Sequence, residues 1–164
     1  MSSVSEPPDT ATPFTVGVIS DTHGLLRPEA LAALAGVNHI LHAGDVGNPT
    51  ILDSLMALAP LTAIRGNIDT SGPCARLPAT DFVQLAGKLF YLVHSVHDLD
   101  VDPTAAGIDV VVSGHSHQAR SVVEEGILFL NPGSAGPRRF KLPVTVALVH
   151  IQGAALTHRI LTLL

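Results

Sequence analysis

Short apolar runs separated by polar turns fill the chain from residue 14 onward. The first run, FTVGVIS, is rich in β-branched residues and ends at Asp21, as buried strands do. Two later runs begin close to a proline, which favours the first turn of a helix. The pattern predicts a βαβαβ unit with strands at residues 14–20, 39–42 and 61–64 and helices at residues 27–35 and 49–58. Such a unit forms a parallel sheet with its functional edge at the strand C-termini.

Strands predominate after Leu77. Residues 81–85 and 88–93 flank Ala86-Gly87 and predict a hairpin, and residues 144–151 and 154–161 predict a closing hairpin over Gln152-Gly153. Three further strands at 109–112, 121–124 and 127–130 and one short helix at 103–106 complete the prediction. The second half is therefore expected to be mostly β.

Domain organisation follows from length and patterning. Residues 1–13 hold three prolines and two acidic residues without apolar periodicity, so we expect a flexible tail there. The remaining residues 14–164 are expected to form one domain, because 164 residues that are 46% apolar can close a sizeable core. The same composition excludes a disordered chain.

Charge and cysteine content narrow the class of protein. The net charge of −5 excludes a broad basic surface for nucleic acid. The single cysteine, Cys74, cannot form an internal disulfide, the first residues lack a signal-peptide pattern, and no uncharged stretch is long enough to span a membrane. We expect a cytoplasmic protein without a membrane partner. The low charged fraction of 14% leaves self-association into a homo-oligomer open.

Histidine is over-represented, since nine histidines equal the sum of lysines and arginines. Several of them follow predicted strands together with carboxylates and an amide. The side chains in these positions are Asp21, His23, Asp45, Asn67, His94, His115 and His117. Imidazole, carboxylate and amide oxygen suit Mn²⁺, Fe²⁺ or Zn²⁺ and exclude a thiolate site. We expect glycines 24, 44, 66 and 114 to let the backbone bend where these ligands are aimed inward.

Five motifs in order resemble the calcineurin-like metallophosphoesterase superfamily. They are Asp21-x-His23, Gly44-Asp45, Gly66-Asn67, His94 and Gly114-His115-Ser116-His117. The short chain and the turn Asn131-Pro-Gly-Ser134 are similar to its compact bacterial and archaeal phosphodiesterase branch. The resemblance implies an α/β fold in a single domain: a four-layer αββα sandwich with two mainly β central sheets and two metal ions at the strand ends.

The resemblance also implies a ligand set and an activity. Asp21, His23 and His117 would bind the first metal, Asn67, His94 and His115 the second, and Asp45 would bridge the two. The cofactors would be two divalent ions, Mn²⁺ foremost, with Fe²⁺, Zn²⁺ and Ni²⁺ as alternatives. The implied function is a phosphoesterase, foremost a phosphodiesterase, that hydrolyses a small phosphate ester by in-line attack of a metal-bridging hydroxide.

The chain departs from the superfamily pattern at the general acid. Ile68 stands where phosphatases of the superfamily often carry a histidine. His97 is a candidate catalytic replacement, but it could equally line the substrate pocket or lie on a loop. Asn67 is a candidate ligand and phosphate contact, and Arg65 is either a substrate-binding cation or a surface residue.

Two residues near the motifs are expected to support the site. His42 is predicted to be a buried histidine whose N–H finds a backbone carbonyl. Asp69 is predicted to cap a turn or to hold His23 or Asn67 in place.

Two other functions compete with a two-metal phosphoesterase. A non-catalytic metal-binding scaffold of the same fold is one, since a retromer subunit resembles the superfamily and acts as a scaffold. The presence of His23 and of every other expected ligand favours catalysis. A mononuclear zinc hydrolase is the other, but it requires only three ligands and a water, fewer than the seven side chains found here.

Overall fold

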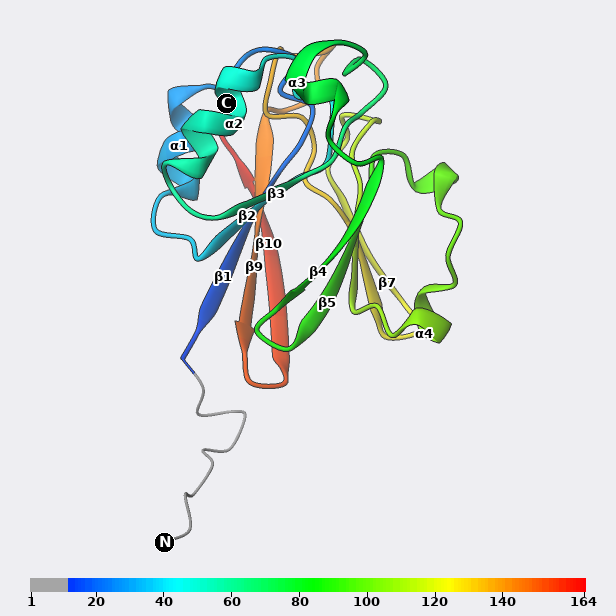
Figure 1. Ribbon diagram of the computed structural model, residues 1–164. Helices are drawn as coiled ribbons and strands as arrows, with labels where there is room; N and C mark the ends of the chain where they lie inside the picture. The colour runs from blue at the N-terminus through cyan, green and yellow to red at the C-terminus, as the bar shows by residue number, and fades with distance from the viewer. Residues whose placement is uncertain (1–11) are drawn as a thin grey trace, which may run out of the picture.

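Two β-sheets packed face to face form the centre of the molecule (Figure 1). The computed structural model describes residues 12–164, so the predicted tail at residues 1–13 lies almost wholly outside the described residues. Each sheet has five strands. The predicted single-domain α/β sandwich is confirmed.

The first sheet combines the predicted βαβαβ unit with the closing hairpin. Its strand order is β10-β9-β1-β2-β3, where β1, β2 and β3 run parallel and β9 and β10 pair antiparallel. The strands are β1 Phe14–Ile19, β2 His39–His42, β3 Leu61–Ala63, β9 Thr145–Gln152 and β10 Ala155–Thr162. Helices α1 (Pro28–Leu34) and α2 (Pro49–Met56) cover its outer face, where Leu34 and Leu55 are fully buried.

The second sheet contains an unexpected parallel core. Its order is β4-β5-β6-β8-β7, and β5, β6 and β8 run parallel between antiparallel edge strands. The strands are β4 Thr80–Leu85, β5 Lys88–Val93, β6 Val110–Val112, β7 Arg120–Glu124 and β8 Ile127–Asn131. Sequence patterning predicted these strands but not their direction, because buried apolar runs look alike in both kinds of sheet.

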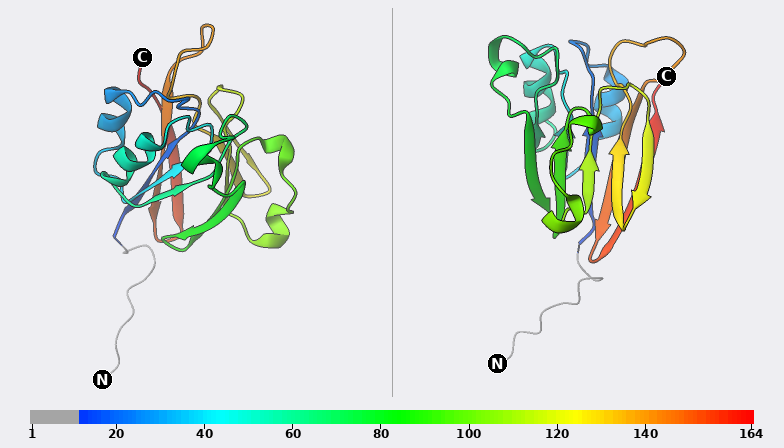
Figure 2. Two further views of the ribbon diagram at one scale, coloured as in Figure 1. Left: turned by 45° about the horizontal axis from the view of Figure 1, so that its top comes forward. Right: turned by 90° about the vertical axis from the view of Figure 1, so that its right-hand side faces the viewer.

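The outer face of the second sheet is only partly covered. The segment that carries the 3₁₀ turn η2 (Val96–Asp98) and the single-turn helix α4 (Pro103–Ala106) crosses it. Leu99 and Val101 of this segment pack against the small apolar cluster that contains the buried Tyr91. Figure 2 shows how little this segment covers compared with α1 and α2 on the opposite side. The fourth layer of the sandwich is therefore thin.

Alternation along the strands builds the core between the sheets. Phe90 and Leu92 of β5 point inward to the shared core, whereas Tyr91 and Val93 point outward. Among residues 12–164, no helix combines the length and the apolar character that crossing a membrane requires.

The closing hairpin differs from the prediction by one residue. Its turn is Gly153-Ala154 and not Gln152-Gly153, since Gln152 pairs with Ala155. Gly153 has a φ of 60°, and a glycine in this conformation suits the first central position of a two-residue hairpin turn. The short helix α3 (Gly72–Ala75) and η2 were also not predicted, because single turns leave no apolar periodicity.

Candidate metal centre

The side chains singled out in the sequence gather where parallel strands of both sheets end. Asp21 and His23 follow β1, Asp45 follows β2 and Asn67 follows β3. The second sheet contributes His94 after β5 and, after β6, His115 and His117. The strands that precede these residues run parallel to one another within each sheet, β1 to β3 in the first and β5 and β6 in the second, so each set meets at one sheet edge. The packing of the two sheets brings the two sets together.

Three of these residues form a compact group. Asp21, His23 and His117 offer potential ligand atoms that all lie within 4.8 Å of one another. Asp21 Oδ1 is 3.5 Å from His117 Nε2 and 3.7 Å from His23 Nε2. This is the set that the family resemblance implies for the first metal.

A second group shares Asp21 and adds Asp45 and His94. Asp45 Oδ2 lies 3.3 Å from His23 Nε2 and 3.2 Å from His94 Nε2. This carboxylate oxygen therefore stands between an imidazole of the first group and the imidazole of the second. The placement is the one that a bridging carboxylate requires.

Asn67 and His115 lie at the exposed side of the cluster. His115 Nδ1 is 3.2 Å from Asn67 Oδ1, and the His115 ring lies 5.2 Å from that of His94, centroid to centroid. The backbone N–H of His115 donates to Asp21 Oδ2 at 3.1 Å. All seven candidates thus meet in one region, although their individual roles as ligands stay predictions.

Buried polar atoms without partners mark the centre of the cluster. Within residues 12–164, four such side-chain atoms have no hydrogen-bond partner, namely Asp21 Oδ1, His23 Nε2, His94 Nε2 and His117 Nδ1. Burying an unpaired polar group is costly, so four of them in one place call for a ligand. Imidazole nitrogens and carboxylate oxygens suit a divalent cation, and the residues present therefore fit the metal that the resemblance implies.

Hydrogen bonds set the direction of these ligand atoms. His94 Nδ1 is 2.7 Å from the carbonyl oxygen of Ala43, which can only accept, so Nδ1 carries the proton and Nε2 offers its lone pair to the cluster. The Ser20 hydroxyl donates to Asp21 Oδ2 at 2.8 Å. One oxygen of Asp21 is thereby held by the protein, and Oδ1 faces the histidines.

The two carboxylates respond differently to their surroundings. Burial raises the pKa of Asp21, and this effect outweighs the opposing influence of His94, Ser20 and His117. Burial also raises the pKa of Asp45, but the adjacent His94 imidazole, the hydrogen bond from the Ile68 N–H and the positive charge that His23 can carry together lower it to about 2. Asp45 is therefore an anion at any physiological pH.

The backbone is strained at five of the seven candidates. Asp21, His23, Asp45, His115 and His117 all have positive φ values, between 46° and 74°. Residues other than glycine rarely adopt this region, and such residues gather at functional sites. The folded chain keeps these conformations because the surrounding loops are tied together.

Asp69 provides one of those ties. Its carboxylate accepts hydrogen bonds from the backbone N–H groups of Val46, Gly47 and Gly66, at 3.1, 3.0 and 2.9 Å. These bonds join the loop after β2 to the loop after β3. The prediction that Asp69 caps a turn is confirmed.

His42 provides another tie, in a way that the sequence did not show. Its Nδ1 accepts from the Gly44 N–H, so its Nε2 donates to Thr22 Oγ1, which in turn donates to the carbonyl of Val46. His42 is fully buried, as expected. Its N–H, however, reaches a hydroxyl and not a backbone carbonyl, because Thr22 lies between His42 and the carbonyl of Val46. Burial lowers the pKa of His42 to about 4.

Gly66 and Gly114 serve close packing rather than sharp bending. Neither has a positive φ, in contrast to Gly24 and Gly44, so the expected reason was wrong for these two positions. A Cβ on Gly66 would lie 2.0 Å from Asp45 Oδ1, and one on Gly114 would lie 2.1 Å from Ser20 Oγ. The candidate ligands beside these two glycines therefore pack directly against backbone that carries no side chain.

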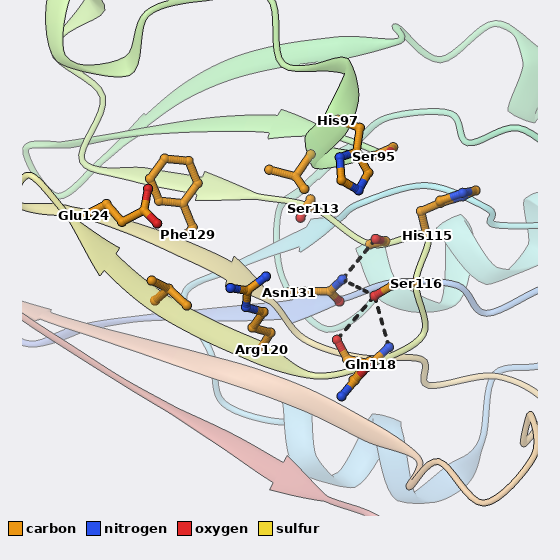
Figure 3. A pocket seen from close by; sticks show the side chains of 13 residues that line it. Ser95, His97, Ser113, His115, Ser116, Gln118, Arg120, Glu124, Phe129 and Asn131 are labelled. Carbon is orange, nitrogen blue, oxygen red and sulfur yellow. Dashed lines mark hydrogen bonds between the residues drawn. The ribbon is translucent and has the colours of Figure 1, made fainter.

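The weaker sequence candidates lie at the rim. Arg65 is exposed, and its Nη1 donates to the carbonyl of Leu77 at 2.7 Å. His97 is exposed on η2 and lines a groove beside His115 (Figure 3). Asn131 belongs to the turn that resembles one beside the site in the family, but the sequence did not predict its contacts. Its Nδ2 donates to the Gly114 carbonyl and to Ser116 Oγ, which supports the loop of His115.

Comparison with known proteins agrees with the fold and with the family resemblance. Residues 14–154 match the family described as the calcineurin-like phosphoesterase superfamily domain. A probable metallophosphoesterase of Methanothermobacter thermautotrophicus is 34% identical over 158 residues, which cover 89% of this chain and 91% of that protein.

Two solved structures share the fold at low identity. A single mutant of Vps29 from Entamoeba histolytica superposes with a TM-score of 0.77 at 23% identity, over 92% of this chain and 93% of that one. A novel archaeal phosphodiesterase superposes with a TM-score of 0.74 at 21% identity, over 90% of this chain and 100% of that one.

Proposed function

The chain belongs to the calcineurin-like phosphoesterase superfamily, and on that premise we propose that it is a dinuclear-metal-dependent phosphodiesterase for small phosphate esters. One observation carries the proposal: two ligand groups share Asp21, and the Asp45 carboxylate stands between the imidazoles of His23 and His94. Seven side chains exceed what a mononuclear hydrolase needs. The phosphodiesterase among the structural neighbours is consistent with the diester class.

Asp21, His23 and His117 would hold one cation, and Asn67, His94 and His115 the other, with Asp45 between them. When bound, two such cations, Mn²⁺ in our proposal, supply a hydroxide nucleophile and positive charge for the phosphoryl oxygens. Asp45 is suited to its place because its pKa of about 2 keeps it ionised. Asn67 is exposed, so its N–H₂ group is free to contact a phosphoryl oxygen while Oδ1 stays on the side of His115.

His97 is our proposed proton donor for the departing alcohol. It lies on η2, three residues beyond His94, and borders the groove that begins at His115. Replacing His97 by alanine should slow the hydrolysis of esters with poor leaving groups and leave p-nitrophenyl esters unaffected, since p-nitrophenolate needs no proton to depart. Equal rates with both kinds of ester would remove His97 as the acid.

We propose that Arg65 is an auxiliary substrate contact. Its bond to the Leu77 carbonyl already accounts for its position. We further propose a cytoplasmic location, because the lone Cys74 is buried and unpaired.

The Asp45→Ala variant tests the proposed function. Wild-type protein loaded with Mn²⁺ should hydrolyse bis(p-nitrophenyl) phosphate and contain close to two metal equivalents by elemental analysis. Asp45→Ala should lose turnover roughly a thousandfold or more and bind less metal. Asp53→Ala, a change on the exposed face of α2, is the matched control and should behave as wild type.

The scaffold alternative makes the opposite prediction. Vps29 shares this fold, so a role in docking other proteins is the alternative. A protein that uses the fold in this way would show no metal-dependent turnover. Less than one metal equivalent in the wild type, together with unchanged behaviour of Asp45→Ala, would reject the phosphodiesterase.

A further inference from the structure

A groove of about 370 Å³ runs from the candidate metal centre across the outer face of the second sheet. The thin fourth layer leaves this face open over β7 and β8, where Phe129 is only half-buried. Figure 3 shows His115 at one end of the groove and Glu124 at the other, with Arg120 and Phe129 between them. Its volume is within the range of roughly 300–1,000 Å³ that small-molecule sites occupy.

The groove is lined by apolar and charged side chains at regular positions along the strands. Arg120, Val122 and Glu124 alternate along β7 and so point to the same face, and Val122 pairs with Phe129 of β8. An aromatic and an aliphatic side chain thus form the floor, with a cation and an anion beside it. Among the described residues, neither the Arg120 guanidinium nor the Glu124 carboxylate has a hydrogen-bond or ion-pair partner, so both are available to a ligand.

The end of the groove at His115 is fixed by the protein. Asn131 Nδ2 donates to the Gly114 carbonyl and Ser116 Oγ, which ties the loop of His115 to the end of β8. A phosphoryl group held beside His115 and Asn67 would therefore direct one ester substituent along the groove. That substituent would meet the ring of Phe129 and, next to it, one donor side chain and one acceptor side chain.

We propose that this groove binds the nucleoside part of a phosphodiester, with the base on Phe129 and its polar edge facing Arg120 and Glu124. A nucleobase offers an aromatic face together with hydrogen-bond donors and acceptors, which is the combination that the three side chains match. An alkyl chain could make no hydrogen bond to Arg120 or Glu124. The proposal rests on the proposed function and names the class of substrate.

Two chromogenic diesters test the proposal, because both release p-nitrophenolate and differ only in the retained group. The p-nitrophenyl ester of thymidine 5′-monophosphate carries a nucleoside, and methyl p-nitrophenyl phosphate carries a methyl group. In the Mn²⁺-loaded wild type, kcat/KM should be higher for the nucleoside ester. Phe129→Ala should lower that preference about tenfold, in line with the worth of stacking a base on an aromatic ring. Arg120→Ala should lower it as well.

Matched controls separate the groove from the rest of the sheet. Phe82 is a half-exposed aromatic residue on the same outer face, on β4 and outside the groove, so Phe82→Ala should keep the preference. Arg159→Ala, on exposed β10, serves in the same way for Arg120. Phe129→Leu retains apolar packing and should lose the preference without losing the folded state. An unchanged preference in Phe129→Ala and Phe129→Leu would overturn the proposal.

Binding of thymidine 5′-monophosphate, measured by calorimetry, distinguishes failure of the groove from failure of the proposed function. If the wild type hydrolyses neither diester, the phosphodiesterase fails, and the groove is then judged by binding alone. Severalfold weaker binding to Phe129→Ala than to wild type and Phe82→Ala would support the nucleoside site. Equal binding to all three proteins would reject it.

Discussion

The candidate metal centre has two unequal halves. The enclosed half consists of Asp21, His23, Asp45, His94 and His117, which lie under the loops and contain all four buried unpaired polar atoms. The open half consists of Asn67 and His115, both exposed and joined to each other at 3.2 Å. We propose that this difference reflects a division of labour, in which the enclosed half fixes the charge and geometry of the site and the open half admits the substrate.

The largest expected effect separates the two halves directly. His117→Ala removes an imidazole from the enclosed half and should reduce diester turnover by roughly a thousandfold, with a loss of about one metal equivalent. His115→Ala should cost about ten- to a hundredfold, because the exposed position can be filled by water. Elemental analysis and steady-state kinetics provide the measurements. Equal losses in the two variants would contradict the distinction between enclosed and open halves.

A smaller effect is expected from packing behind Asp45. Gly66→Ala places a methyl group 2.0 Å from Asp45 Oδ1 and should lower the free energy of unfolding by about 3 kcal/mol in denaturant titrations. Gly126→Ala is the control, since its Cβ would meet no atom within 4 Å. Its φ of 77° should cost about 1 kcal/mol. If Gly66→Ala costs no more than Gly126→Ala, the enclosed half is not tightly packed.

The smallest effect concerns the buried histidine behind the enclosed half. The pKa of His42 is about 4 in the folded protein against an ordinary value of 6.5, so the unfolded chain takes up its proton first as the pH falls. This contribution is complete above pH 6.5 and is lost below it, by about 2 kcal/mol between pH 8 and pH 5. The His42→Asn variant keeps an acceptor for the Gly44 N–H and should lose less stability over the same range. Parallel pH profiles for the two proteins would show that His42 does not titrate on unfolding.

Features of this molecule that depend on neighbouring residues could be predicted from the sequence, whereas those that depend on distant contacts could not. The strands and the polar residues that follow them could be predicted, because an apolar run followed by Asp21, Asp45 or His115 is a local sequence pattern. The supporting contacts were not, because Asp69 reaches back to Val46 and Asn131 to Gly114 across 23 and 17 residues. The groove was not foreseen either, since it depends on how little of the second sheet the segment with η2 and α4 covers.

The positive φ values at Asp21, His23, Asp45, His115 and His117 restrict the ways in which this site can change during evolution. Asn, Asp and His tolerate the left-handed region better than other residues with a side chain, and β-branched residues tolerate it least. Exchanges among these three types keep the backbone in place and change the charge, the reach and the ligand atom of the side chain. A descendant of this chain could therefore shift its metal preference by single exchanges, whereas a valine or isoleucine at the same positions would disturb the loop before it altered the chemistry.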